Sequence, residues 1–229
     1  MSNLCIIPAR GGSKRIPKKN IKDFLGKPII AYSIQVAKES NLFDEIMVST
    51  DDKEIAEISI KLGAKVPVFR SPENSDDFST TSDVLIEVLE KYKQTGINFE
   101  NCCCIYPTSP LINKNSLIKA YNLLESENFQ SVFPVVKFSY PIYRALQMND
   151  SKVSMIWEEN LNKRSQDLPS AYHDSGQFYW FTVSEFFKSK KLFTENSGAI
   201  VLKETEVQDI DNETDWKLAE LKYKLMKHP

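Results

Sequence analysis

A dense run of cations follows the first apolar segment of this chain. Residues 4–7 (LCII) are typical of a buried parallel strand, and residues 8–20 (PARGGSKRIPKKN) come directly after it. The first 22 residues hold six Lys and Arg and no Asp or Glu, whereas the whole chain has 29 basic and 31 acidic residues. Because so much charge makes a poor core, the fold must leave this loop accessible where the strand ends. Such a loop is suited to hold several phosphates.

The residue types in the loop favour phosphate binding. Gly11 and Gly12 let the backbone approach a ligand closely or adopt φ > 0, and successive N–H groups in such a turn bind anions. Arg10 can bind phosphate through a bidentate fork, while Lys14 and Lys19 act as mobile point charges. The glycine spacing matches neither a dinucleotide-binding turn nor a P-loop. The alternatives are a solvated basic loop that binds nothing, or a nonspecific nucleic-acid patch.

Residues 8–20 resemble the signature of the CMP-sialic acid synthetase family of cytidylyltransferases, and other segments agree in the same order. Within that family, residues 171–180 are most similar to the branch that acts on pseudaminic acid. The resemblance implies transfer of CMP from CTP to a nine-carbon sugar acid, with N-acetylneuraminate or legionaminate as alternative acceptors. A non-catalytic nucleotide-binding protein is the alternative from another class. The agreeing segments are residues 48–52 (VSTDD), 106–111 (YPTSPL), 166–169 (QDLP) and 209–211 (DID).

The resemblance also implies which residues bind the nucleotide. Arg10 and Lys19 would stabilise the reacting phosphates as catalytic residues, and Lys14 would hold the β- and γ-phosphates. Arg70 and Thr81 correspond to the arginine and the small hydroxyl residue that the family uses around cytosine, although Arg70 alone reads as a surface charge. Asn20 would bind a ribose hydroxyl, unless it is only a turn residue. The full nucleotide-binding set is Ala9, Arg10, Gly11, Gly12, Ser13, Lys14, Asn20, Arg70 and Thr81.

Two late carboxylates indicate a metal site. If residues 206–210 form a strand, Asp209 and Asp211 point to the same side at ~7 Å separation. Two like charges that close are unfavourable unless a cation lies beside them, and Mg²⁺ suits carboxylates and nucleotide phosphates. The alternative is that Asp211 caps the final helix and Asp209 is solvated. The family uses this D-x-D for its metal, so the resemblance implies Mg²⁺ here.

The sugar acid is expected to meet the ends of later strands and residues 138–171. His173 could orient the sugar or move a proton, although a lone histidine is more often structural. The chain departs from the sialic acid enzymes at Tyr106, Tyr143, Ser165 and Ser175, all on the expected sugar side, which favours pseudaminic acid and leaves CTP unaffected. The expected sugar-binding residues are Tyr106, Thr108, Arg144, Gln166, Tyr172, His173, Gln177 and Tyr179.

Alternating strand-like and helix-like patterns predict a three-layer α/β/α, Rossmann-like nucleotidyltransferase with a mainly parallel sheet. We expect one cytidylyltransferase domain over residues 1–229. In it, residues 138–171 fit an inserted hairpin or arm with exposed aromatic residues, or else a poorly packed surface excursion. The resemblance implies that this arm serves dimerisation and the sugar site. Strands are expected at 3–8, 45–49, 65–69, 102–106, 131–137, 177–181, 199–202 and 206–210. Helices are expected at 28–39, after Asp51 or Asp52, after Thr80, at 113–127, at 184–190 and from about 212.

Composition limits the remaining possibilities. The chain is 41% hydrophobic and 26% charged, as in globular proteins, and no apolar run approaches the ~20 residues of a membrane span. No secretory signal is recognisable, so we expect a cytoplasmic protein that binds neither membrane nor nucleic acid. The resemblance implies that it is a homodimer. Cys102, Cys103 and Cys104 are consecutive in a predicted strand and point to alternate faces, so with Cys5 they are expected to be buried thiols rather than a metal site.

Overall fold

The computed structural model of the protein describes residues 2–75 and 78–227. Within these residues a seven-stranded sheet has the order β11-β6-β10-β5-β1-β4, with β9 added beside β6. The strands of this sheet are β1 (Asn3–Pro8), β4 (Glu45–Ser49), β5 (Asn101–Ile105), β6 (Ser131–Lys137), β9 (Tyr172–Asp174), β10 (Phe178–Thr182) and β11 (Ser197–Leu202). The helices are α1 (Ile30–Ser40), α2 (Lys53–Lys61), α3 (Thr81–Gln94), α4 (Lys114–Glu127), α5 (Val183–Ser189) and α6 (Glu213–Lys227).

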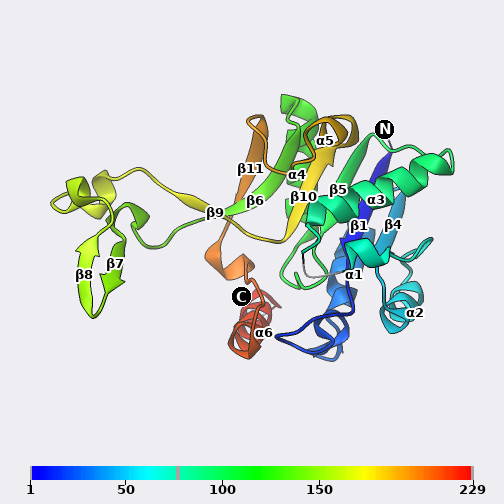
Figure 1. The fold of residues 1–229 in the computed structure, drawn as a ribbon, viewed down its shortest axis with the longest axis horizontal. Coiled ribbons are helices and arrows are strands. Elements are labelled where there is room, and N and C mark those ends of the chain that lie inside the picture. Colours follow the sequence, from blue (N-terminus) through cyan, green and yellow to red (C-terminus); the bar gives the residue numbers. More distant parts are fainter. Residues whose placement is uncertain (1, 76–77, 228–229) are drawn as a thin grey trace.

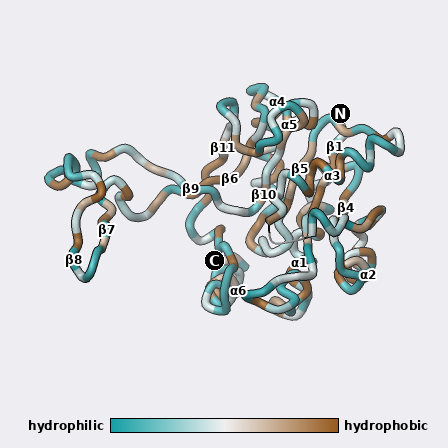
Figure 2. The backbone as a smooth tube through the Cα atoms, viewed as in Figure 1, coloured by the Kyte–Doolittle hydropathy of each residue, from teal (hydrophilic) through white to brown (hydrophobic). Residues whose placement is uncertain are grey.

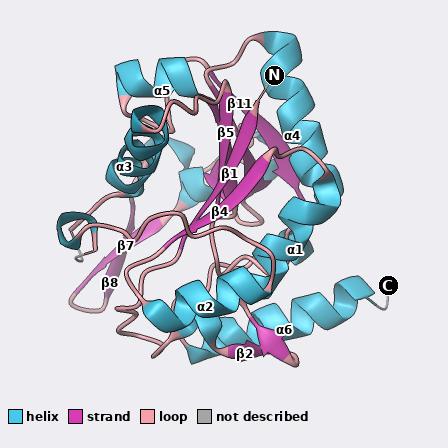
Figure 3. Ribbon diagram, turned by 90° about the vertical axis from the view of Figure 1, so that its right-hand side faces the viewer, coloured by secondary structure: helices cyan, strands magenta, loops and turns pink. Residues whose placement is uncertain are grey.

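The sheet is mixed, and its strands β5, β1 and β4 are parallel to one another. β1 runs parallel to both β4 and β5, and β6 runs parallel to β11. β10 is antiparallel to β5 and β6, and β9 is antiparallel to β6. The carboxyl ends of β1, β4 and β5 therefore share one edge of the sheet, where ligands bind in open α/β folds. The predicted three-layer fold is confirmed, with helices on both faces of the sheet (Figure 3).

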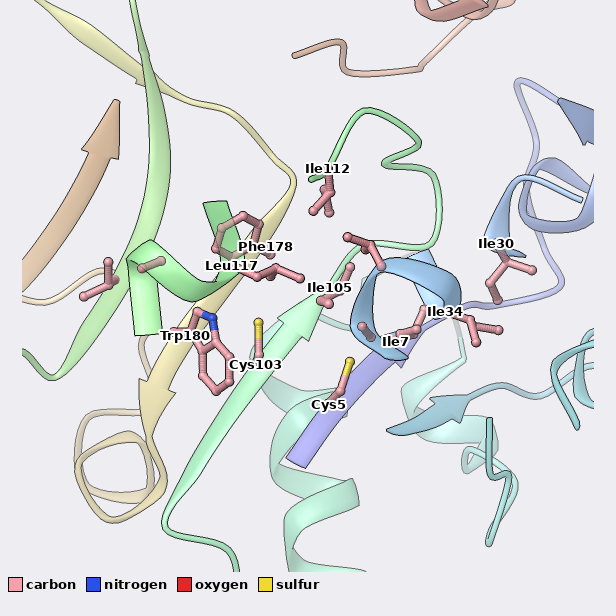
Figure 4. Close-up of a cluster of buried hydrophobic side chains, with 14 of the residues drawn as sticks. Cys5, Ile7, Ile30, Ile34, Cys103, Ile105, Ile112, Leu117, Phe178 and Trp180 are labelled. Carbon is pink, nitrogen blue, oxygen red and sulfur yellow. The ribbon is translucent and has the colours of Figure 1, made fainter. Parts of the chain in front are cut away.

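Alternating side chains of the strands build a core on each face of the sheet. Cys103 and Ile105 pack beneath α1 and α4, together with Trp180 (Figure 4), whereas Cys102 and Cys104 pack beneath α3 and α5. Cys5, Cys102, Cys103 and Cys104 are all 0% exposed. Burial raises the pKa of these thiols, so they remain protonated and act as small apolar groups. The prediction of buried thiols is confirmed.

A third, smaller apolar cluster joins the basic loop to the end of the chain. Phe24 lies in the hairpin formed by β2 (Asp23–Phe24) and β3 (Lys27–Pro28). Its ring packs edge-on against those of Tyr32 and Trp216, with ring centroids 5.3 and 5.6 Å apart. Ile16 of the loop and Ile210, which lies just before α6, are buried in the same cluster. Apolar packing thus holds two segments far apart in sequence against each other.

Several helix boundaries agree with their sequence signals. Asp52 caps α2 by accepting hydrogen bonds from the N–H groups of Glu54 and Ile55. Thr80 and Asp83 form the predicted capping box at the start of α3. α1 begins at Ile30, two residues after its predicted start.

Two predicted strands are absent from the described part of the chain. Over residues 65–69 only Lys65 bridges to Met47, and Pro67 has no N–H group with which to extend a ladder. Glu206 ends a 3₁₀ turn that begins at Glu204, and residues 207–212 are irregular up to α6. The argument that a strand places both carboxylates of 209–211 on one side was therefore wrong.

The buried face of α6 carries Trp216 rather than the leucines of the helix. Leu218, Leu221 and Leu225 are 42%, 61% and 59% exposed, whereas Trp216 and Ala219 are buried. The aromatic cluster around Phe24 selects the face that contains tryptophan, and it leaves the leucine stripe in solvent. No helix within the described residues is both long and apolar enough to cross a lipid bilayer.

The segment between β6 and β9 leaves the sheet and projects away from the rest of the molecule (Figure 1). It contains the hairpin β7 (Leu146–Asn149) and β8 (Lys152–Met155), and apolar and polar segments alternate along it (Figure 2). Tyr140 is 79% exposed and Met148 is 71% exposed. The predicted hairpin with exposed aromatic and apolar side chains is therefore present in residues 138–171, hereafter the arm.

Replacement of Phe24 by alanine should destabilise the protein strongly, because it removes the ring on which the third cluster packs. We expect the free energy of unfolding to fall by about 3–5 kcal/mol, measured by urea denaturation. Leu221→Ala on the exposed face of α6 is the matched control, with an expected loss below about 1 kcal/mol. Equal losses for the two variants would contradict the observed orientation of α6.

Candidate functional site

Two adjoining cavities lie at the carboxyl edge of the sheet, beside the ends of β1 and β5. The larger has a volume of about 470 Å³ and the smaller about 200 Å³. Pro8, Arg10 and Tyr106 line both cavities, so a ligand can extend from one to the other. The larger cavity is further lined by Ser13, Lys14, Arg15, Ile16, Lys19, Asn20, Pro107, Thr108 and Asp209. The smaller is further lined by Arg70, Asn74, Ser79, Thr80, Thr81 and Val84.

The acidic turn after β4 holds the start of the basic loop. The Gly11 N–H donates to Asp51 Oδ1 at 2.9 Å. A Cβ atom at Gly11 would lie 2.8 Å from Asp52 Oδ2, so only glycine fits against this turn. A Cβ at Gly12 would meet nothing within 4 Å. Neither glycine has φ > 0, and the left-handed residue of the loop is Lys18 at φ 51°. Glycine is needed at position 11 because the turn after β4 approaches the backbone there closely, and not because that backbone is left-handed.

Acidic residues from other elements hold part of the loop in place. Lys18 pairs with Glu54 of α2 at 2.5 Å, and Lys22 pairs with Glu213 of α6 at 2.5 Å. Arg15 pairs with Asp211 at 2.8 Å. Such pairs are individually weak where they are exposed, but together they position the loop from both sides. Arg10, Lys14 and Lys19 are brought to the larger cavity, as the sequence predicts.

Lys19 joins the loop to residues 209–211. Its Nζ donates to the carbonyl oxygen of Ile210 at 2.7 Å and lies 4.0 Å from the Asp211 carboxylate. Burial lowers the pKa of Lys19, while Asp211 and Asp209 act in the opposite direction. The ammonium group is thus held at the junction of the two motifs that the sequence separates by 191 residues.

The two aspartates have different surroundings. Asp209 lines the larger cavity, and partial burial followed by the charge of Asp211 raises its pKa. Asp211 is paired with Arg15 and does not cap α6. Asn212 takes that role, since its Oδ1 accepts from the N–H groups of Thr214 and Asp215. The alternative in which Asp211 is a helix cap was therefore wrong.

The carboxylates at residues 209–211 could hold a magnesium ion only if a substrate supplied further oxygen ligands. No group of three or more metal-ligating side chains occurs in the part of the chain that the structure describes. Mg²⁺ is commonly bound by one or two carboxylates, with phosphates and water as the other ligands. Asp209 in the cavity, with Asp211 near enough to raise its pKa, fits that requirement.

The smaller cavity contains a buried cation. Arg70 is 9% exposed, and its Nε and Nη2 donate to Ser49 Oγ at 3.2 Å and Ser49 O at 2.7 Å. Burial lowers the pKa of this guanidinium. Arg70 is therefore not an ordinary surface charge, and the alternative reading was wrong. Thr81 lies in the same cavity, with its hydroxyl 3.0 Å from the Tyr106 hydroxyl.

The other predicted nucleotide residues brace the loop or line the larger cavity. Ala9 is buried, and its N–H donates to the Ser49 carbonyl at 2.8 Å. Asn20 is also buried, and its Nδ2 donates to the Arg10 carbonyl at 2.8 Å while its side chain lines the larger cavity. Ser13 lies at the wall of that cavity. Asn20 thus makes a bond that shapes the loop.

The predicted sugar residues do not all reach the cavities. Tyr106 and Thr108 line them, whereas Tyr172 and His173 are exposed on β9 at the base of the arm. Gln177 is buried with its Nε2 2.6 Å from the carbonyl of Glu206. Tyr179 lies next to a residue of the cavity wall, since the centroids of the Tyr179 and Tyr106 rings are 5.7 Å apart. Arg144 and Gln166 are carried by the arm and line neither cavity.

Two acidic residues with positioning contacts were absent from the predicted site. Asp51 anchors Gly11, and Asp174 accepts a hydrogen bond from Tyr179. Asp51 belongs to the VSTDD segment, which the sequence analysis used only as a sign of resemblance. Nothing in the spacing of Asp174 indicates its partner, because the contact depends on how β9 and β10 pair with the same neighbour.

Comparison with known proteins agrees with this geometry. The sequence is 44% identical over 226 residues to a pseudaminic acid cytidylyltransferase of Campylobacter jejuni, covering 98% of this chain and 97% of that protein. It is 32% identical to a CMP-N,N'-diacetyllegionaminic acid synthase of Legionella pneumophila, covering 96% and 95%. The fold matches a CMP:2-keto-3-deoxy-manno-octonic acid synthetase complexed with CTP, with a TM-score of 0.70, 16% identity and full coverage of both chains. Residues 4–222 match the cytidylyltransferase family, and the chain belongs to that family.

Proposed function

We propose that the protein transfers CMP from CTP to the anomeric hydroxyl of pseudaminic acid and releases pyrophosphate. One observation carries the proposal most directly: the basic loop meets residues 209–211 through Lys19, and the loop and Asp209 line one cavity that continues into a smaller one. A triphosphate in the larger cavity and a base in the smaller one would account for both volumes. The name and high identity of the Campylobacter relative support pseudaminic acid as the acceptor.

In the proposed reaction, the sugar hydroxyl attacks the α-phosphorus and pyrophosphate leaves in line with it. The protein supplies positioning and charge rather than a covalent intermediate. Arg10 and Lys19 would stabilise negative charge that develops on the transferring phosphate, and Lys14 would hold the β- and γ-phosphates. These groups are useful because the fold orients them before the substrate arrives, so little reorganisation is needed during the reaction.

We propose Mg²⁺ as the metal, held by Asp209 and Asp211 together with phosphate oxygens of CTP. Bound magnesium would neutralise charge on the triphosphate. Asp211 has a second function in the proposal, since its pairing with Arg15 keeps the loop beside the metal site. Asp209 lines the larger cavity and Asp211 does not, so Asp209 would be the main protein ligand.

We further propose a homodimer in which the arm completes the sugar site of the partner. The support is that the arm exposes Leu146, Met148 and Val153, which are 57%, 71% and 61% accessible. Arg144 and Gln166 would then contact sugar in the partner's cleft. Sedimentation velocity that showed only a monomer would contradict this. A cytoplasmic location is proposed because CTP is an intracellular nucleotide.

The acceptor can be identified by measuring pyrophosphate released from CTP and Mg²⁺ with a panel of nine-carbon sugar acids. We expect kcat/KM to be highest for pseudaminic acid, with N-acetylneuraminate and legionaminate poorer by at least about tenfold, as when a site built for one set of polar groups meets another. Equal use of all three acids would contradict the proposed specificity. No pyrophosphate with any of them would contradict the proposed reaction.

Lys19→Ala should lower kcat by about 10²–10³-fold, as expected for loss of one preorganised charge donor. Lys18→Ala is the matched control, because Lys18 is adjacent in sequence but pairs with Glu54 at the surface, and its kcat should change less than about threefold. Circular dichroism would confirm that both variants fold. Near-normal turnover of Lys19→Ala would remove this residue from the mechanism.

The lowered pKa of Lys19 also gives a pH test. Turnover needs the ammonium form, so kcat/KM should fall on the alkaline side at a pH below the ordinary pKa of lysine. Lys19→Arg retains the charge at every accessible pH and should remove that alkaline limb, even if its turnover is lower. An unchanged limb in Lys19→Arg would assign the titration to another group.

Asp209→Asn should raise the Mg²⁺ concentration needed for half-maximal activity by at least about tenfold, because one carboxylate ligand is lost. Glu213→Gln is the control, since Glu213 lies near Asp209 in sequence but pairs with Lys22 at the surface. A magnesium titration of pyrophosphate release would measure both variants. An unaltered titration for Asp209→Asn would contradict the metal assignment.

A further inference from the structure

The segment that carries both candidate metal carboxylates has no sheet ladder or α-helix to hold it. It runs from the end of β11 at Leu202 to the start of α6 at Glu213, and apart from the 3₁₀ turn at Glu204–Glu206 it is irregular. A backbone outside regular structure must find other partners for its N–H and C=O groups. Here several of these partners are side chains from other parts of the fold.

A lysine of α6 holds the first half of the segment. Lys222 Nζ donates to the carbonyl oxygens of Glu204 at 3.0 Å and Val207 at 2.7 Å. Burial lowers the pKa of Lys222, so its ammonium group has given up part of its hydration for these two bonds. One cation on α6 therefore ties the start of the 3₁₀ turn to the residue that follows the turn.

An acid of the same helix holds the second half of the segment. Asp215 Oδ2 accepts hydrogen bonds from the N–H groups of Asp211 at 2.9 Å and Asn212 at 3.1 Å. Asp215 and Lys222 are two helical turns apart, so they lie on the same side of α6 at a separation of about 10 Å along its axis. The helix thus offers a cation to the carbonyl groups and an anion to the N–H groups of one segment.

Gln177, just before β10, supplies a third contact. It is 3% exposed, and its Nε2 donates to the Glu206 carbonyl oxygen at 2.6 Å, between the two carbonyls that Lys222 binds. Its Oε1 is buried and has no hydrogen-bond partner among the described residues. A buried glutamine with one unpaired polar atom is a poor choice for stability alone. Its presence is explained if the bond to Glu206 serves to place the residues that follow.

We propose that Lys222 and Gln177 are positioning residues for the magnesium site, because the carbonyl groups that they hold fix where Asp209 enters the larger cavity. Asp209 lies two residues beyond the last of these carbonyls, and Lys19 binds the carbonyl of the residue after it. Asp209 is therefore held on both sides along the chain. The inference rests on the proposed function, since it requires Mg²⁺ and CTP at this site.

The test uses Lys222→Met, which removes the ammonium group and keeps an unbranched apolar stem. We expect the Mg²⁺ concentration for half-maximal pyrophosphate release to rise by about tenfold, the usual effect of losing a contact that orients a metal ligand. The KM for CTP at saturating Mg²⁺ should change less than about threefold, because the contacts of the loop to the nucleotide remain. Hydrogen exchange of the ligand-free protein should become faster over residues 203–212 and stay unchanged in the central strands.

Three further variants complete the test. Gln177→Met removes the bond to Glu206 together with the unpaired Oε1, and it should raise the magnesium requirement in the same way. Lys222→Arg keeps a cationic donor and should return the requirement to within about threefold of the wild-type value. Lys224→Met is the matched control, because Lys224 is exposed on α6 and the loss of its charge should leave the requirement unchanged.

The outcomes separate the two proposals. Wild-type protein that releases no pyrophosphate from CTP would overturn the proposed function. Active wild-type protein, with an unchanged magnesium requirement in Gln177→Met and in any folded Lys222→Met, would overturn only the inference about positioning. A rise that Lys224→Met shares, or faster exchange throughout the sheet of Lys222→Met, would be a general effect of lost charge or stability and would also overturn it.

Discussion

The contact between Lys19 and the segment before α6 is the interaction on which the site depends. The ammonium group of Lys19 bonds the Ile210 carbonyl, and Arg15 pairs with Asp211 beside it. These bonds join the start of the chain to its end, across 191 residues. Without them the cations of the loop would repel one another and the acids of residues 209–211 would do the same. Bringing the two groups together lowers both repulsions, while Arg10, Lys14 and Asp209 still line the cavity.

The apolar clusters make this electrostatic contact possible. Ile16 and Ile210 are both buried with Phe24, so packing rather than charge brings the loop to residues 209–211. Surface ion pairs alone would contribute too little to hold a loop with so many like charges. On the other side, Asp51 holds Gly11, and the absence of a Cβ there allows the turn after β4 to approach. The loop is therefore clamped between two acidic segments, each placed by its own part of the core.

The sequence predicted those features that depend on local patterns. The strand before the loop, the cap at Asp52 and the chemical type of the loop residues all follow from neighbouring residues. The strand at 206–210 was wrong because its two apolar residues pack into different clusters instead of pairing with the sheet: Val207 joins the core beneath α1 and α4, and Ile210 joins the third cluster. The buried face of α6 does not follow from its sequence pattern for a related reason. Its leucines form the more regular stripe, but Trp216 makes the aromatic contacts. Partners such as Arg15 and Asp211 lie far apart in sequence, so no local pattern could reveal them.

The same reasoning limits how the sugar acid is recognised. Tyr179 and Gln177 lie close to the expected sugar region, but their polar groups bond Asp174 and the Glu206 carbonyl within the protein. Such buried groups shape the wall of the cavity and cannot readily change partners, because an unpaired buried polar group is costly. In the proposed enzyme, direct contacts to the sugar would therefore come from groups that are still accessible, such as Thr108 in the cavity and the exposed side chains of β9 and the arm. The arm projects away from the rest of the molecule (Figure 1), so the proposed sugar contacts on it would lie apart from the residues that line the two cavities.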